Sequence, residues 1–223
     1  MAHERNASPM VLKRQLDFMA SVDCDVWLLA EVPYTFNTVS EPGSTALSES
    51  MDRTHKVYAA VWAKDGLTKE REVHEAAALA TVGGLRVCSC LLPSNETAFK
   101  DWPDRGFDRP SVLRKTVDRL HAALGAGSGG LVLGGSWSQA FEGEDEVGTD
   151  DGRESIGELL ATLDLQLATA ALPRARDGEG SSTDHIAVPR AWNVISASRV
   201  VAAEIGGHPR SGDHDAYIAE VEP

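Results

Sequence analysis

The chain has 223 residues, 42% of them hydrophobic, and a formal net charge of −13 at pH 7. This length and composition suffice for one hydrophobic core, so we expect a single domain over residues 1–223. Sequence-independent affinity for nucleic acid comes mainly from Lys and Arg at phosphates, and the acidic balance therefore disfavours a nucleic-acid partner.

Cysteine usage and hydropathy bear on the compartment. Cys24, Cys88 and Cys90 show no metal-ligand spacing and are interpreted as small core residues in a reducing environment. No apolar run has the length of a signal peptide or of a bilayer span. We therefore expect a cytoplasmic protein without a membrane partner.

The first predicted elements are a helix and a strand. Ser8 and Pro9 favour a helix start, because a capping hydroxyl precedes a proline at the first helical position. Apolar residues then share one face, which predicts a helix ending near Ser21. A strand is expected at 26–31. Residues 34–53 are rich in Ser, Thr, Glu, Pro and Gly and are predicted to form either a loop on the substrate side or a partly ordered excursion.

A strand is expected at 57–63, and the segment after it is ambiguous. The Glu and Ala content of residues 69–82 favours a helix, whereas Val82-Gly83-Gly84-Leu85 indicates a tight hairpin joining 77–82 to 85–92. Beyond the predicted loop at 93–108, Asp108-Arg109-Pro110 begins a helix that should stop at Gly125.

The second half alternates strands and helices. Residues 141–151 hold six carboxylates whose spacing fits no calcium loop, so we expect a solvated acidic loop before an amphipathic helix. A charged, Gly-rich loop is expected at 174–182. Further strands are predicted from Asp184, over 192–201, and over 216–221, the last closing the sheet. The pattern favours a sheet core with helices outside.

Polar side chains follow the most strand-like segment. The apolar run Leu131–Leu133 lies between glycine pairs, which predicts a strand buried on both faces. Ser136, Trp137, Ser138 and Gln139 come directly after it, where open α/β sheets commonly place function.

Four short segments, in this order, resemble the endonuclease/exonuclease/phosphatase superfamily, the deoxyribonuclease-I-like fold, from about residue 10 to the end. They are Asp25-Val-Trp-Leu-Leu-Ala-Glu31-Val, Gly135-Ser136-Trp137-Ser138, Asp184-His185 and Ser211-Gly212-Asp213-His214. In that family a metal-binding Glu ends a strand, followed by Gly-Asp-x-Asn, Asp-His or Asp-Tyr, and Ser-Asp-His. The resemblance implies a four-layer α/β sandwich, and it favours the hairpin over the helix at 77–92.

The departures from the family pattern concern the chemistry. Ser136 and Ser138 replace the Asp that activates water and the Asn that binds phosphate. Serine cannot serve as a general base, and losing both groups should reduce hydrolysis by several orders of magnitude. The family's first strand, which ends in Asn, is expected to be shortened or missing; Asn6 is a candidate for that residue only if the start folds differently.

The resemblance also implies roles for the remaining residues. His214 would contact a scissile phosphate, with Asp184 orienting it and Asp213 close to the metal. Glu31 would bind a divalent cation such as Mg²⁺, weakly or not at all without the Asn, so the expected cofactor is either none or Mg²⁺. His185, His208 and Asp215 are interpreted as structural or solvent-facing.

Three functions follow. The first is acid/base chemistry on a small molecule, or its binding, with His214, Asp184 and Ser136 as catalytic residues and Trp137, Ser138, Gln139 and Asp213 contacting the substrate. The second is weak Mg²⁺-dependent phosphoesterase activity. The third is a serine nucleophile in a Ser136-His214-Asp184 arrangement.

Two expectations remain open. The aromatic residues could line an apolar pocket or belong to the core; they are Tyr34, Phe36, Trp102, Phe107 and Trp137. A missing first strand would leave a sheet edge that a partner chain could cover, so a homodimer is conceivable.

Overall fold

The computed structural model describes residues 9–36, 43–51, 56–93, 102–106, 108–125, 130–142, 147–173, 182–201 and 216–223. Its helices are α1 (Pro9–Ser21), α3 (Arg109–Leu124) and α4 (Asp150–Thr162). Its strands are β1 (Val26–Pro33), β2 (Thr45–Leu47), β3 (Lys56–Ala63), β4 (Thr68–Lys69), β5 (Ala77–Val82), β6 (Leu85–Cys90), β7 (Leu131–Ser136), β8 (Leu165–Leu167), β9 (Asp184–Pro189), β10 (Asn193–Val200) and β11 (Ala216–Glu222).

The strands form two sheets and a separate ribbon. The smaller sheet has the order β1-β3-β2 and the larger has the order β4-β5-β6-β7-β9-β8. Strands β6 and β7 are parallel, whereas the other pairs are antiparallel. A parallel pair needs a long crossover, and α3 supplies it. Strands β10 and β11 pair with each other.

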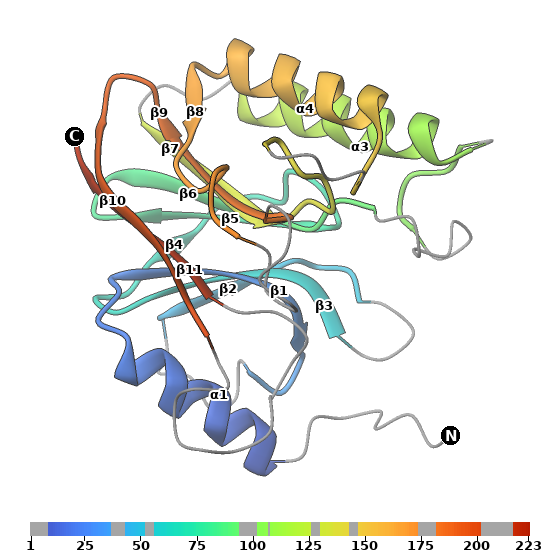
Figure 1. Cartoon of the computed structure of the whole chain (residues 1–223). Helices are drawn as coiled ribbons and strands as arrows, with labels where there is room; N and C mark the ends of the chain where they lie inside the picture. Colours follow the sequence, from blue (N-terminus) through green and yellow to red (C-terminus); the bar gives the residue numbers. More distant parts are fainter. Residues whose placement is uncertain are drawn as a thin grey trace.

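The two sheets face each other, with helices on their outer sides (Figure 1). Leu12 and Met19 of α1 pack on the smaller sheet through Trp27 and Val57. Helices α3 and α4 cover the larger sheet through a cluster that includes Leu120 and Leu133. A third cluster, of Ala59, Val61, Ala78, Ala80 and others, joins residues of both sheets. Burial of these apolar side chains is the main stabilising contribution.

Most predicted elements are confirmed. The helices begin and end close to the expected residues, and the hairpin over 77–92 is the one observed, with Ala77 opposite Cys90 and Val82 opposite Leu85. Helix α3 starts with a capping box between Asp108 and Ser111, and Pro110 lies in its first turn.

Three expectations are corrected. The segment 34–53, predicted to be a loop, contains β2, and β8 follows α4 without having been predicted. These three-residue strands are too short to show alternation. Strand β11 does not close a sheet within the described residues, because it pairs with β10 alone.

The three cysteines are free, and Cys88 and Cys90 are buried in the core. Burial raises the pKa of the Cys90 thiol to about 12 and also raises the pKa of Cys88. Both thiols are therefore uncharged core side chains, as expected. Within the described ranges, none of the helices combines the length and hydrophobicity that crossing a membrane requires.

The two ends of the sheets differ. At one end, Asp25 at the start of β1 accepts a hydrogen bond from the amide of Lys64 at 2.9 Å. The neighbouring turn residue Gly66 shares an open hollow of about 500 Å³ with Gly83 and Gly84, the turn between β5 and β6. The carboxyl ends of β1, β6 and β7 consequently lie at the opposite end, which we call the carboxyl edge.

Candidate functional site

Ser136 and Asp184 face each other at the carboxyl edge. The last residue of β7, Ser136, pairs with the first residue of β9, Asp184, in the antiparallel register. The backbone amides of Trp137 and Ser138 both donate to the carbonyl of Thr183, at 2.9 and 3.2 Å. Both Ser136 and Asp184 are half-buried. Two of the three predicted catalytic residues are thus held together by the backbone of adjacent strands.

Two close approaches bring β7 against its neighbours. Gly135 has φ of +131°, and a Cβ there would collide with the carbonyl oxygen of Cys90 in β6. A Cβ on Gly134 would lie 2.6 Å both from the carbonyl oxygen of His185 in β9 and from Leu28 in β1. The glycines are therefore required for the strands and sheets to approach this closely.

Glu31 lies at the end of β1, on the same edge. The Ser89 hydroxyl of β6 donates to the carbonyl of Leu29 at 2.9 Å, which fixes β1 over the larger sheet. Glu31 has φ of +52°, and this interrupts the alternation of β1, because Leu29 and Val32 both pack on the cluster beneath α1. The carboxylate is therefore exposed rather than turned into the core.

Backbone strain coincides with predicted site residues. In the described part of the chain, the non-glycine residues with positive φ are Glu31, Ser138 and Asp164. Asp164 follows the end of α4, where a left-handed residue is common. Glu31, with φ of +52°, and Ser138, with φ of +55°, have no such explanation. Strained backbone of this kind concentrates at functional sites.

Trp137 and Gln139, which the sequence predicts to contact a substrate, are both buried. Trp137 is 1% exposed and packs in the main core cluster. Gln139 is 4% exposed, and its Oε1 accepts a hydrogen bond from the amide of Thr149 at 2.8 Å. Thr149 caps α4, so Gln139 ties the segment after β7 to the start of that helix.

Two of the other predicted aromatic residues follow the core interpretation. Phe36 and Trp102 are buried, at 2% and 3% exposure, whereas Tyr34 is 54% exposed. Phe107 lies outside the described residues. Among the described ones of these aromatic side chains, Tyr34 is thus the one that does not belong to the core.

His185, interpreted from the sequence as a secondary residue, is a buried structural side chain. Its Nε2 lies 2.7 Å from the carbonyl oxygen of Gln139 and donates to it. Its ring contacts Trp137 and Phe141, with ring centres 5.3 and 5.0 Å apart. Burial lowers the pKa of His185, so the ring is neutral at pH 7.

The predicted residues His214 and Asp213 lie outside the described residues, as do Asn6, His208 and Asp215. Their roles remain predictions. The described part of the site therefore consists of Ser136, Ser138, Asp184 and Glu31.

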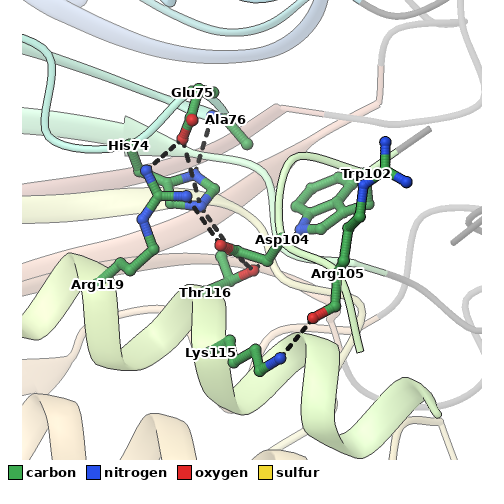
Figure 2. Close-up of polar contacts among 9 residues, drawn as sticks. All are labelled: His74, Glu75, Ala76, Trp102, Asp104, Arg105, Lys115, Thr116 and Arg119. Carbon is green, nitrogen blue, oxygen red and sulfur yellow. Dashed lines mark hydrogen bonds and ion pairs between the residues drawn. The ribbon is translucent and has the colours of Figure 1, made fainter. Parts of the chain in front are cut away.

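A buried polar cluster lies beside the carboxyl edge, and sequence patterns did not reveal it (Figure 2). His74 Nε2 is 2.7 Å from Asp104 Oδ2, and the Thr116 hydroxyl donates to the same oxygen at 2.6 Å. Arg119 donates to Asp104 Oδ1 at 2.8 Å and to Glu75 at 2.5 Å. The indole of Trp102 donates to the Thr116 hydroxyl at 2.9 Å. We call these six residues the His74 cluster.

The His74 cluster contains two carboxylates, Asp104 and Glu75, which share one cation, Arg119. Burial lowers the pKa of His74, which outweighs the opposing contribution of the Asp104 carboxylate. Burial by itself raises the pKa of Asp104, but the hydrogen bonds from Thr116, Arg119 and His74 together hold that pKa below its usual value. A neutral imidazole thus meets an ionised carboxylate whose charge is compensated by Arg119.

One signal in the sequence could have indicated this cluster. Thr116 is fully buried on the face of α3 that carries Leu113, Val117 and Leu120. A hydroxyl among apolar inward positions needs a hydrogen-bond partner. The pattern does not identify that partner, because Asp104 and His74 come from separate loops.

The two buried histidines predict acid sensitivity. Unfolded histidine titrates near pH 6.5, whereas the folded pKa values of His74 and His185 are lower, so the unfolded state binds more protons below about pH 6.5. The free energy of unfolding should be constant from pH 8 to 7 and fall from pH 6.5 to 5.5. Urea denaturation at each pH measures this, and an unfolding free energy that stays level or rises toward pH 5.5 would contradict it.

The described residues do not form a metal centre. Glu31 and Asp184 contribute carboxylates to the carboxyl edge, and Mg²⁺ prefers such oxygen ligands. Nowhere in the described ranges do three His, Cys, Asp or Glu side chains gather closely enough to hold an ion.

Solved structures of other proteins have the same arrangement of two facing sheets with helices on both outer sides. The chain has the α/β fold of endonuclease/exonuclease/phosphatase proteins. It matches an AP endonuclease from Archaeoglobus fulgidus with a TM-score of 0.72 and 12% identity, over 98% of this chain and 97% of that one.

Two further structures show the same likeness. The 3′ phosphatase NExo from Neisseria, bound to a product DNA hairpin, has a TM-score of 0.70 and 17% identity, with 97% and 96% of the two chains covered. An endonuclease/exonuclease/phosphatase family protein from Leptotrichia buccalis has a TM-score of 0.56 and 12% identity, with 96% and 93% covered. No family model and no curated protein matches the sequence.

Proposed function

We propose that this chain is a divergent protein of the endonuclease/exonuclease/phosphatase type that uses His214 and Asp184 for acid/base chemistry on a small molecule, or for its binding. The observation that carries the proposal is the pairing of Ser136 with Asp184 at the carboxyl edge. The resemblance places a water-activating carboxylate at the position of Ser136. A serine hydroxyl cannot replace that base, so ordinary hydrolysis is lost.

The described residues take distinct parts in this proposal. Asp184 orients His214, and Ser136 and Ser138 offer hydroxyls that donate or accept hydrogen bonds to a polar substrate. Asp213 adds a carboxylate beside them. Trp137 and Gln139 support the segment from the core side. The net charge of −13 favours a small molecule over a nucleic acid.

The finer architecture is also a proposal. We infer a four-layer sandwich whose first strand is shortened or missing. In support, β1 is an edge of its sheet within the described residues, and β10 and β11 form a ribbon without hydrogen-bonded pairing to either sheet. Such an edge could be covered by a partner chain, including a second copy.

Two other functions have specific support. Weak Mg²⁺-dependent phosphoesterase activity is favoured by the exposed, strained carboxylate of Glu31 at the same edge. The names of the matched structures, an AP endonuclease and a 3′ phosphatase, point in the same direction. A Ser136 nucleophile is favoured by its position opposite Asp184, although no nucleophile elbow is present in the sequence.

Restoring the two replaced side chains tests the proposal. We expect the wild-type protein to show no specific heat of Mg²⁺ or Mn²⁺ binding by isothermal titration and no hydrolysis of nitrophenyl phosphomonoesters or phosphodiesters. The double variant Ser136→Asp/Ser138→Asn should raise hydrolysis by about 10²-fold or more over the background, since it restores a base and a phosphate ligand. Ser198→Asp, at an exposed serine of β10, is the matched control.

The alternatives give different results. Metal binding by the wild type, with turnover lost in Glu31→Gln and His214→Ala, would establish the phosphoesterase and overturn the small-molecule proposal. Turnover without metal that Ser136→Ala abolishes would establish the serine nucleophile.

A further inference from the structure

The His74 cluster is connected to Ser136 through three hydrogen bonds and the peptide link between Leu91 and Leu92. The Ala76 amide donates to His74 Nδ1 at 2.9 Å. The Ala76 carbonyl accepts from the Leu91 amide at 3.0 Å, and the adjacent Leu92 amide donates to the Ser136 carbonyl at 2.9 Å. Ser136 in turn lies opposite Asp184. The series thus crosses the ends of β5, β6, β7 and β9.

We propose that His74 is a positioning residue whose Nδ1 holds the Ala76 amide, and through it the carboxyl edge with Ser136 and Asp184, while Asp104 fixes the tautomer of the ring. The pair is 1% and 7% exposed and does not reach a substrate, so it acts through the backbone of Ala76 and Leu91. The inference deepens the proposed function and rests on it for its catalytic consequence.

The tautomer of His74 is determined by its two partners. Nδ1 faces the Ala76 amide and must be the acceptor, so Nε2 carries the proton and donates to Asp104. A single neutral ring therefore links the loop before β5 to Asp104, which Thr116 and Arg119 fix to α3. The bond at Nδ1 holds the Ala76 amide, and the bond at Nε2 holds the ring against Asp104.

Protonation of His74 would remove one of these bonds. A charged imidazole donates from both nitrogens, so the Ala76 amide would lose its acceptor. The charged groups that face the ring are Asp104, Arg119 and Glu75, the last with Oε2 3.9 Å from Nε2. The carboxylates favour a charged ring, whereas Arg119 and burial oppose it. Acid should therefore loosen the carboxyl edge before the rest of the protein.

Two substitutions separate the two bonds. In His74→Asn the side-chain oxygen takes the place of Nδ1 and can accept from the amide two residues on, as in an Asx turn. In His74→Gln the amide nitrogen takes the place of Nε2 and can donate to Asp104, but nothing replaces Nδ1. Leu160→Ala, a core substitution in α4, is the control for general destabilisation.

Hydrogen exchange of individual amides provides the measurement. In His74→Gln, protection of the Leu91 and Leu92 amides should fall by about tenfold more than that of amides in α4, whereas His74→Asn should keep it within about threefold of wild type. Between pH 7 and 5, protection factors at this edge should decline in wild type but not in His74→Asn. Leu160→Ala should lower protection throughout.

The positioning role would be overturned if His74→Gln and His74→Asn lost the same amount of hydrogen-exchange protection at the Leu91 and Leu92 amides. It would also be overturned if the protection fell evenly over the whole protein. These readouts need no turnover, so they decide the inference even where the proposed function fails. If the double variant Ser136→Asp/Ser138→Asn gains hydrolysis, adding His74→Gln should lower its kcat at least tenfold more than adding His74→Asn does.

Discussion

Replacing Gly135 by alanine is expected to lower the free energy of unfolding by about 3 kcal/mol or more, a loss few single substitutions produce. Its φ of +131° is strained for any residue with a Cβ. The added carbon would collide with the carbonyl oxygen of Cys90 and lie 3.0 Å from its carbonyl carbon. Both atoms are backbone, and they cannot move without separating β6 from β7. Urea denaturation followed by circular dichroism measures the change.

Gly157 provides the matched control for this substitution. It lies inside α4, and a Cβ there would meet nothing within 4 Å. Gly157→Ala should leave the stability unchanged or increase it by up to about 1 kcal/mol, because alanine is the better helix former. If the unfolding free energy of Gly135→Ala stayed within about 1 kcal/mol of wild type, β6 and β7 would be able to separate without the predicted loss of stability.

Removing the Asp104 carboxylate should have the second large effect. Asp104→Ala leaves the Thr116 hydroxyl, the His74 N–H and one face of Arg119 without their acceptor. Breaking a buried ion pair of this kind costs about 3–5 kcal/mol. Arg119 is 44% exposed and keeps its contact with Glu75, so we expect about 3 kcal/mol, measured as the shift in unfolding free energy.

The control is an ion pair of similar geometry on the surface. Lys13 and Asp17 are 2.6 Å apart in α1, with side chains 74% and 62% exposed. Asp17→Ala should change the stability by less than about 0.5 kcal/mol, because solvent screens such pairs. Similar effects of Asp104→Ala and Asp17→Ala would mean that the His74 cluster contributes no more than a surface contact.

The sequence predicted those elements whose ends are marked by residues next to them in the chain, such as helix caps and glycine turns. Asp108 and Pro110 mark the start of α3, and Gly83-Gly84 marks the turn between β5 and β6. Strand β2 escaped prediction because its three residues lie in a polar segment and pair with β3 across the chain. The separation of β10 and β11 from the sheets depends likewise on contacts between distant residues.

The site shows the same division. The order of the short segments predicted that Ser136 and Asp184 come together, and the register places them opposite each other. Trp137 and Gln139 were predicted to contact the substrate because they follow a strand, and their burial could not be predicted because residues at that position can turn inward or outward. The His74 cluster has no sequence motif, since its pairs lie 12 to 44 residues apart.

The contrast between the two ends of the sheets bears on how this scaffold can diverge. At one end the chain reverses within two residues, Gly83 and Gly84, and little length can change there without altering the strand pairing. At the other, residues 91–108 and 137–149 connect strands to helices. Structures that match over nearly their full length at 12–17% identity show that this fold accommodates large differences of sequence. Gly135 and Asp104 lie at this second end and are expected to stabilise the fold, so changes in these connections have to preserve their contacts.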